Sequence, residues 1–193
     1  MQLDKDYKGF SFSKDGPLDM RMDPTQELTA REIVNTWSEK ELGRIFQEYG
    51  EEPKWRQAAK AIVEARKKKA IETTKQLSEI ICRNARGRGR LHPATLVFQA
   101  LRISVNRELD ALSEGLAKAI DFLAPEGIMG VISFHSLEDR IVKNLFRMAA
   151  KSSKGQVAPV LKLLTKKPLV PSWSETKLNP RARSAKLRFA QKL

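Results

Sequence analysis

The segment FHSLEDR, residues 134–140, gathers the side chains of this sequence that are best suited to chemistry. It holds an imidazole at His135, a hydroxyl at Ser136, two carboxylates and a guanidinium at Arg140. It directly follows an apolar run of strand length, and ligands of open α/β sheets bind beyond the carboxyl ends of strands. We therefore take His135 and Asp139 as candidate catalytic residues for moving a proton. The alternative is structural: a polar cluster at a strand end also starts a helix, with Ser136 as the cap.

Other reaction centres find little support in the residue types. His92 and His135 are the only histidines, and no acidic residue stands at helical ligand spacing between them, so no metal site is expected. The single cysteine, Cys82, excludes an internal disulfide and a multi-cysteine zinc site. Neither a Gly-x-Ser-x-Gly elbow nor a phosphate-cradling glycine loop occurs in the sequence. A hydrolase triad and a nucleotide-binding loop are therefore not predicted.

Positive charge is the second chemical feature, and it is concentrated in two blocks. The net charge is +13; residues 54–90 carry +9 and residues 147–193 carry +11, whereas residues 1–53 and 91–146 carry −5 and −2. Separate basic blocks in an otherwise acidic chain are typical of a surface that binds a phosphate backbone. Solvated helix faces that favour solubility are the alternative. An anionic membrane is disfavoured, because neither block carries a bulky aromatic face.

Within these blocks the cations cluster in three short stretches. RKKK (66–69) ends a predicted helix, and RNARGRGR (83–90) interleaves arginine with glycine, cannot pack a core and can lie along phosphates. NPRARSAKLR (179–188) arranges arginines around a turn, where their guanidinium forks can bind phosphates. Each stretch alone could equally be solvated surface. The candidate RNA-binding residues are Lys67, Lys68, Lys69, Arg86, Arg88, Arg90, Arg140, Arg181, Arg183 and Lys186.

The first half of the chain is predicted to be helical. Two segments of capping-box form, starting at Thr29 and at Ser38, indicate helix starts, and two more helices are expected before residue 90. Four short helices without strands predict a helical domain or insertion, which we bound at residues 25–90. Before it, residues 1–24 contain Asp-Gly-Pro and Asp-Pro turn signals and predict a structured loop.

Residues 91–193 predict an α/β fold. One or two long helices over residues 94–123 precede the apolar run GIMGVISF (127–134), which is typical of a parallel strand buried on both faces. SAKLRFA (184–190) alternates as a final edge strand would. Helix, turn, buried strand and helix together form half of a doubly wound unit. No stretch approaches the roughly 20 apolar residues of a membrane span, and no signal-peptide pattern opens the chain, so we expect a cytoplasmic location.

Several stretches together resemble the MraW/RsmH family of bacterial S-adenosylmethionine-dependent methyltransferases that act on 16S ribosomal RNA. DGPLDMRMD and FHSLEDRIVK are the most specific of them, because a generic domain does not produce such patterns. All of the stretches follow the family's order. They are QLD (2–4), KGFSF (8–12), DGPLDMRMDP (15–24), YGEE (49–52), HPAT (92–95), FQALRI (98–103), VN-EL (105–109), ISFHSLEDRIVK (132–143) and NPRARSAKLR (179–188).

The resemblance implies an α/β fold, a partial Rossmann-like methyltransferase core interrupted by an all-helical substrate-recognition domain. Residues 1–24 would be a loop of the core, residues 25–90 the helical domain, and residues 91–193 the C-terminal part of the core. The implied reaction transfers a methyl group from S-adenosylmethionine to the exocyclic N4 of a cytidine in 16S rRNA of the small ribosomal subunit. Such a nitrogen is a poor nucleophile, so it must be aligned with the methyl group and must lose a proton to an acceptor.

The chain resembles only the C-terminal two-thirds of the family. The family's glycine-rich loop and its acidic ribose contact would lie before Met1, so Gln2 is the one cofactor contact that matches. Leu96 and Val97 stand where relatives usually have an Arg-Thr pair, and Glu126 stands where they usually have glycine. We therefore expect impaired methylation by this chain. Two alternatives remain open: an inactive rRNA-binding fragment, and a subunit that needs a partner chain or a second copy.

Overall fold

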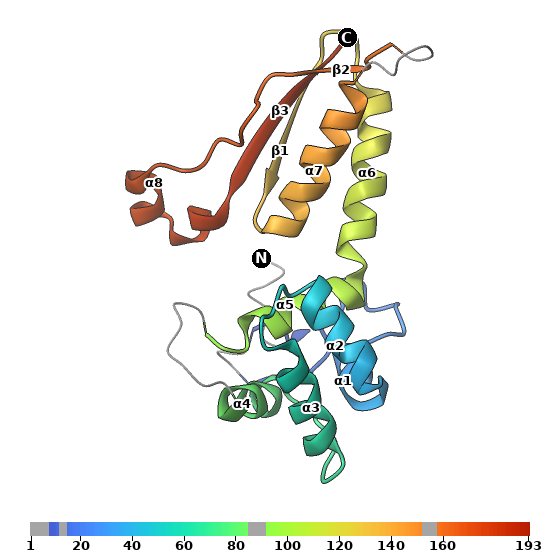
Figure 1. Cartoon of the computed structure of the whole chain (residues 1–193), viewed down its shortest axis with the longest axis vertical. Helices are drawn as coiled ribbons and strands as arrows, with labels where there is room; N and C mark the ends of the chain where they lie inside the picture. Colours follow the sequence, from blue (N-terminus) through green and yellow to red (C-terminus); the bar gives the residue numbers. More distant parts are fainter. Residues whose placement is uncertain (1–7, 12–14, 85–91, 152–157) are drawn as a thin grey trace. The chain divides into compact units, whose positions relative to one another are not determined.

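The computed structural model describes residues 8–11, 15–84, 92–151 and 158–193, which form helices and a small sheet. The chain divides into two compact units, unit 1 (Met1–Glu108) and unit 2 (Leu109–Leu193). Figure 1 shows helices throughout unit 1, and helices packed on strands in unit 2. The mixed helix-and-strand class is thus confirmed, while the domain bounds at residues 24 and 90 stay a prediction. No helix in the described ranges is long and apolar enough to cross a bilayer.

Unit 1 is built from helices whose starts are capped as the sequence predicts. In the first capping box, the Thr29 hydroxyl accepts the N–H of Glu32 at 3.2 Å. In the second, the Ser38 hydroxyl accepts the N–H of Glu41 at 3.2 Å. Both predicted helix starts are therefore confirmed. Each such cap stabilises a helix by about 1 kcal/mol. The helices are α1 (Ala30–Thr36), α2 (Glu39–Glu48), α3 (Trp55–Arg66), α4 (Thr74–Asn84) and α5 (Thr95–Asn106).

These helices share one apolar core, and a glycine allows two of them to approach closely. A Cβ at Gly50 would lie 2.6 Å from the carbonyl oxygen of Leu96, so only glycine fits between the end of α2 and the start of α5. The Gln99 amide donates to the Tyr49 carbonyl at 2.9 Å beside it. The largest fully buried side chains of this core are Leu18, Met20, Ile33, Leu42, Ile45, Phe46, Ile62, Leu77 and Leu101.

The loop before α1 is anchored by backbone hydrogen bonds and by one asparagine of α5. The N–H of Leu18 donates to the Glu72 carbonyl at 2.9 Å. Met20 is buried and has a φ of 64°, a left-handed conformation that costs a residue with a side chain roughly 1–2 kcal/mol. The Asn106 side chain accepts the N–H of Met22 at 2.7 Å and donates to the Met20 carbonyl at 2.8 Å. Asn106 therefore holds this strained turn against α5.

Replacing Asn106 by alanine should lower the free energy of unfolding by about 2–4 kcal/mol, because a part-buried N–H and a carbonyl both lose their partner. Urea titration followed by circular dichroism measures the change. Gln47→Ala is the matched control, since it removes an amide from an exposed helix surface and should change the stability by less than about 0.5 kcal/mol. Equal losses in the two variants would contradict the anchoring role.

Unit 2 packs two long helices on a three-stranded sheet. Its elements are α6 (Glu108–Phe122, of which the first residue belongs to unit 1), β1 (Ile128–Ser133), α7 (Ser136–Ala149), β2 (Leu161–Leu163), α8 (Trp173–Leu178), the 3₁₀ helix η2 (Pro180–Ser184) and β3 (Lys186–Lys192). In Figure 1, α6 and α7 run beside each other along the sheet. Leu116 and Ile120 of α6 and Val142 and Phe146 of α7 are buried in their common core.

The sheet differs from the prediction in pairing and in burial. Its order is β1-β3-β2 and both pairings are antiparallel, so the predicted final strand is confirmed but its edge position is wrong. The strand predicted at 127–134 is also confirmed, yet it is neither parallel nor buried on both faces. Ile128 and Ile132 are 59% and 58% exposed. Met129 and Val131 face the core under α6 and α7, which cover one face only.

The open face of the sheet has an aromatic ring at its centre. Phe189 of β3 pairs with Gly130 of β1, and a Cβ at Gly130 would stand 2.6 Å from the Phe189 ring. The ring thus lies over the glycine between Ile128 and Ile132, and this contact explains why the middle of β1 has no side chain.

Two connections contain residues in left-handed conformation. Arg107, with a φ of 48°, ends α5 and separates it from α6, so the predicted stretch at 94–123 forms two helices. In the predicted turn before β1, the Gly127 N–H donates to the Ala124 carbonyl at 2.9 Å. Glu126 has a φ of 63°, which glycine adopts without cost. This is the position at which we noted the departure from glycine.

Candidate functional site

The polar segment after β1 is organised by His135, which caps helix α7. Its Nδ1 accepts the N–H of Glu138 at 3.4 Å. In return, the Glu138 carboxylate accepts the N–H of Phe134 at 2.7 Å and that of His135 at 3.3 Å. The predicted cap, Ser136, is therefore wrong by one residue, because an imidazole nitrogen replaces the hydroxyl oxygen of a usual capping box.

This capping role selects one tautomer of the neutral His135 ring. Since Nδ1 accepts a hydrogen bond, the neutral ring carries its proton on Nε2. Nε2 is buried and lies 3.2 Å from the Glu138 carboxylate, without the alignment of a hydrogen bond. Burial raises the pKa of Glu138, but the contact with the His135 side chain and the hydrogen bond from the Phe134 backbone outweigh it and hold the pKa below its ordinary value. His135 thus orders the start of the helix with Nδ1, while its Nε2 is buried.

Asp139 forms a buried ion pair with Arg188 of β3. Arg188 Nε lies 2.7 Å from one carboxylate oxygen and its NH2 lies 3.1 Å from the other, and the two residues are only 7% and 9% exposed. The Lys186 ammonium lies 3.7 Å away. The hydrogen bond from Arg188 lowers the pKa of Asp139, against burial, which raises it. An ionised carboxylate held in this way is a weak base, and it links the motif FHSLEDR to the motif NPRARSAKLR.

Sequence reasoning selected Asp139 but missed its partner, Arg188. The alternation of β3 pointed to it, because Arg188 and the buried Ala190 are two residues apart and therefore lie on the same, inward face of the strand. A charged residue on the inward face of a strand requires an opposite charge near it. Asp139 could have been chosen as that charge.

The predicted C-terminal cations lie at the same end of the sheet as this ion pair. Ser133 at the end of β1 pairs with Lys186 at the start of β3. Arg181 and Arg183 belong to η2, directly before β3, and both are exposed. Arg140 is exposed in the second turn of α7. The structure therefore gathers four of the predicted RNA-binding residues around the end of the sheet.

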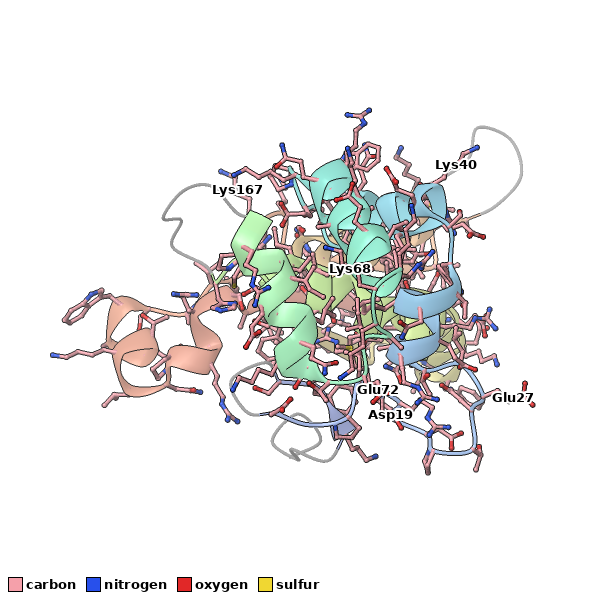
Figure 2. All side chains as sticks on the ribbon, turned by 90° about the horizontal axis from the view of Figure 1, so that it is seen from below. Asp19, Glu27, Lys40, Lys68, Glu72 and Lys167 are labelled. Atoms are coloured by element: carbon pink, nitrogen blue, oxygen red, sulfur yellow. The ribbon has the colours of Figure 1, made fainter. Side chains whose placement is uncertain are left out.

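The remaining predicted cations belong to unit 1 or to segments outside the described residues. Lys67, Lys68 and Lys69 follow α3 and are all exposed; Lys68 is labelled in Figure 2. Arg66 beside them serves the fold instead, because it donates to the Val34 carbonyl at 2.7 Å. The predicted contacts Gln2, Arg86, Arg88 and Arg90 lie outside the described residues.

A pocket of about 670 Å³ in unit 1 was not predicted from the sequence. Its wall is formed in part by the loop DGPLDMR, in which Arg21 chelates Asp19 at 2.8 and 2.9 Å. The hydrogen bond from Arg21 lowers the pKa of Asp19. Five carboxylates line the pocket with two arginines and no aromatic residue; Asp19, Glu27 and Glu72 are labelled in Figure 2. Such a lining suits neither the adenine of S-adenosylmethionine nor a phosphate backbone, so we assign this pocket neither ligand.

Unit 2 is thus an α/β unit with a polar cluster at a strand end and exposed cations around it. The chain belongs to the MraW methylase family, whose model matches residues 1–193, and this confirms the resemblance. It is 54% identical over 208 residues to "Ribosomal RNA small subunit methyltransferase H" of Protochlamydia amoebophila, covering 100% of this chain and 65% of that protein. A protein of the same name from Carboxydothermus hydrogenoformans is 54% identical with the same coverage, and that of Persephonella marina is 51% identical over 98% of this chain and 64% of its own length. The chain thus spans slightly less than two-thirds of these relatives.

Replacing Asp139 by asparagine should lower the free energy of unfolding by about 3–5 kcal/mol at neutral pH, because Arg188 is left buried without its counter-charge. Asp139 contributes stability fully above its ordinary pKa of 3.8, and this contribution is lost as the pH falls through the lowered folded-state value. The difference between wild type and variant should therefore narrow below about pH 4. Denaturant titrations across pH measure it.

The matched control is Asp121→Asn, which neutralises an exposed carboxylate of α6. We expect little change of stability at any pH in that variant. If Asp139→Asn were as stable as this control at neutral pH, the buried pair would not support unit 2.

Proposed function

We propose that this chain serves the S-adenosylmethionine-dependent N4-methylation of a cytidine in 16S rRNA of the small ribosomal subunit, and that its own part is to hold the RNA. The carrying observation is the group of exposed cations, Arg181, Arg183 and Arg140, around the strand end of unit 2. Membership of the family and the names of its relatives support the substrate class. An rRNA substrate also supports the cytoplasmic location.

The chemistry of the reaction explains why cations should surround a strand end. A cytidine must leave its stack before its amino nitrogen can meet a methyl donor, and unstacking a base costs a few kcal/mol. Phosphates bound on either side of the base can offset this cost, because each contact releases a counterion. His135 and Asp139 then act as positioning groups, since their hydrogen bonds hold residues 134–140 in one arrangement. Neither offers an accessible strong base, so the proton acceptor would be another group.

The cofactor finds little support among the described residues. S-adenosylmethionine would supply the methyl group, and Gln2 is the position at which the resemblance suggests a contact. The pocket of unit 1 does not suit an adenosyl group, and the side chains at the strand end are engaged with one another. We therefore derive no step through the cofactor and propose that methylation by the isolated chain is impaired.

The second candidate function, a subunit that needs a partner chain, is favoured by the open face of the sheet in unit 2. Ile128 and Ile132 of β1, and Phe134 directly after it, are 53–59% exposed, and all three occupy even positions, which lie on the same face of the sheet as Gly130. Among the described strands β1 has a neighbour on one side only, β3. Unpaired strand edges and bare apolar faces recruit further polypeptide. Additional strands, from a partner or from a second copy, would cover both.

RNA binding should depend on salt, and the dependence should weaken when the exposed lysines after α3 are removed. A variant with Lys67, Lys68 and Lys69 all changed to alanine should bind a single-stranded fragment of 16S rRNA with a shallower slope of log K against log salt, by about 0.7 for each lost phosphate contact. Fluorescence anisotropy at several salt concentrations measures the slope. The same design applies to Arg86, Arg88 and Arg90.

The control for this experiment is Lys40→Ala, because Lys40 is an exposed lysine of unit 1 that lies outside both basic blocks and is also labelled in Figure 2. Its slope should equal that of the wild type. If the triple variant and the control had the same slope, the block at 54–90 would not contact RNA.

Calorimetry should detect no S-adenosylmethionine binding to this chain at millimolar ligand, because no described pocket suits the adenosyl group. If the chain is a subunit, the same titration should show the heat of S-adenosylmethionine binding once a partner polypeptide that completes the sheet has been added. Clear micromolar binding to the isolated chain would contradict the inactive-fragment alternative.

A further inference from the structure

The segment 164–185 of unit 2, which we call the cationic arm, exposes several large apolar side chains, and the two most exposed of them lie on α8. Trp173 is 77% exposed and Leu178 is 88% exposed, both on α8. Figure 1 shows α8 beyond the beginning of β3, away from α6 and α7. An exposed indole gives up a large hydrophobic stabilisation, so its position on the surface suggests a binding role.

The charge of the arm identifies the kind of partner. The arm contains five basic residues and one acidic residue, Glu175. All five basic residues are exposed: Lys166, Lys167, Lys177, Arg181 and Arg183. This excess favours a polyanion. An aromatic ring among cations is the combination that single-stranded nucleic acid uses, because bases stack on the ring while the cations follow the backbone.

Local contacts hold the indole in place. The Lys177 ammonium lies 5.2 Å from the centre of the Trp173 ring, a cation–π contact one helical turn away. The Ser172 hydroxyl caps α8 by accepting the N–H of Glu175 at 3.1 Å. At the other end, the Asn179 side chain accepts the N–H of Arg181 at 3.2 Å and starts η2. The ring is therefore presented on a capped element next to the cations of η2.

The arrangement of the two apolar residues of α8 disfavours insertion of this helix into a membrane surface or an apolar protein groove. Trp173 and Leu178 are five residues apart, which on a helix separates them by about 140° around the axis. They therefore form no common apolar face, which an interfacial helix or a groove-binding helix requires. A single indole needs no such face to stack on a base.

We propose that Trp173 is a base-stacking contact for single-stranded RNA, and that the cations of the arm bind the phosphates on either side of that base. The inference rests on the RNA-binding function proposed above and deepens it, because it adds a contact to bases where only backbone contacts were inferred. Arg181 and Arg183 serve both proposals, whereas Trp173 serves this one alone.

The test compares two anionic probes of equal length, about 12 nucleotides, which is within the usual range of site sizes. One is an oligocytidylate and the other is an abasic ribose-phosphate oligomer. At constant salt, Trp173→Ala should weaken binding of the oligocytidylate about five- to a hundredfold and leave binding of the abasic oligomer unchanged. Trp173→Phe should retain most of the affinity. Leu178→Ala is the matched control, because it removes an exposed apolar side chain without an aromatic ring, and it should change neither affinity.

The remaining outcomes distinguish the stacking role of Trp173 from the proposed RNA-binding function. If Trp173→Ala binds oligocytidylate like the wild type while Arg181→Ala with Arg183→Ala weakens both probes, the stacking contact is wrong and the RNA-binding function stands. If the wild type binds neither probe nor a 16S rRNA fragment, both are wrong. If Trp173→Ala and Leu178→Ala both abolish binding to phosphatidylglycerol vesicles and neither affects RNA, the arm binds a membrane surface and the proposal is overturned.

Discussion

A carboxylate and a guanidinium, Asp139 and Arg188, meet in the interior of unit 2, and much of that unit is arranged around them. Two charges taken out of water are tolerated only in a geometry that satisfies both, and here the two-pronged contact does so. It fixes the first turn of α7 against the beginning of β3. In consequence the cap residue His135 and the cations of η2 come to the same end of the sheet. The buried ion pair thus also positions the surface that we associate with RNA.

The most distinctive motifs of the chain serve its architecture more than they expose reactive groups. In unit 1 the loop DGPLDMR contains an arginine that chelates Asp19 and a left-handed Met20 that Asn106 holds. In unit 2 the imidazole of His135 replaces a hydroxyl as a helix cap. These groups satisfy hydrogen bonds and charges within the fold. The RNA contacts that we propose are assigned instead to cations on the surface, whose local pattern is far less specific.

Local order was predictable from the sequence, whereas pairing and burial were not. The capping boxes at Thr29 and Ser38 and the strand at 127–134 need only neighbouring residues, and all were found. Whether that strand is parallel, and which faces helices cover, depends on partners far along the chain, so both expectations failed. At the candidate site, the polar segment was recognised, but the cap was assigned to Ser136 because hydroxyls usually fill that place. The partner of Asp139 lies 49 residues away, and only the alternation of β3, which puts Arg188 on the inward face, pointed to a buried charge there.

The Phe189 ring over Gly130 affects the hydration of the open face of the sheet in unit 2. An uncovered glycine in the middle of a strand would leave its peptide groups open to hydrogen bonds with water. Here the Phe189 ring covers these groups with an apolar surface. Water molecules above the strand therefore find few hydrogen-bond partners between Ile128 and Ile132. Their release on coverage is entropically favourable, and the associated heat-capacity decrease would be a calorimetric signature of any polypeptide that settles there.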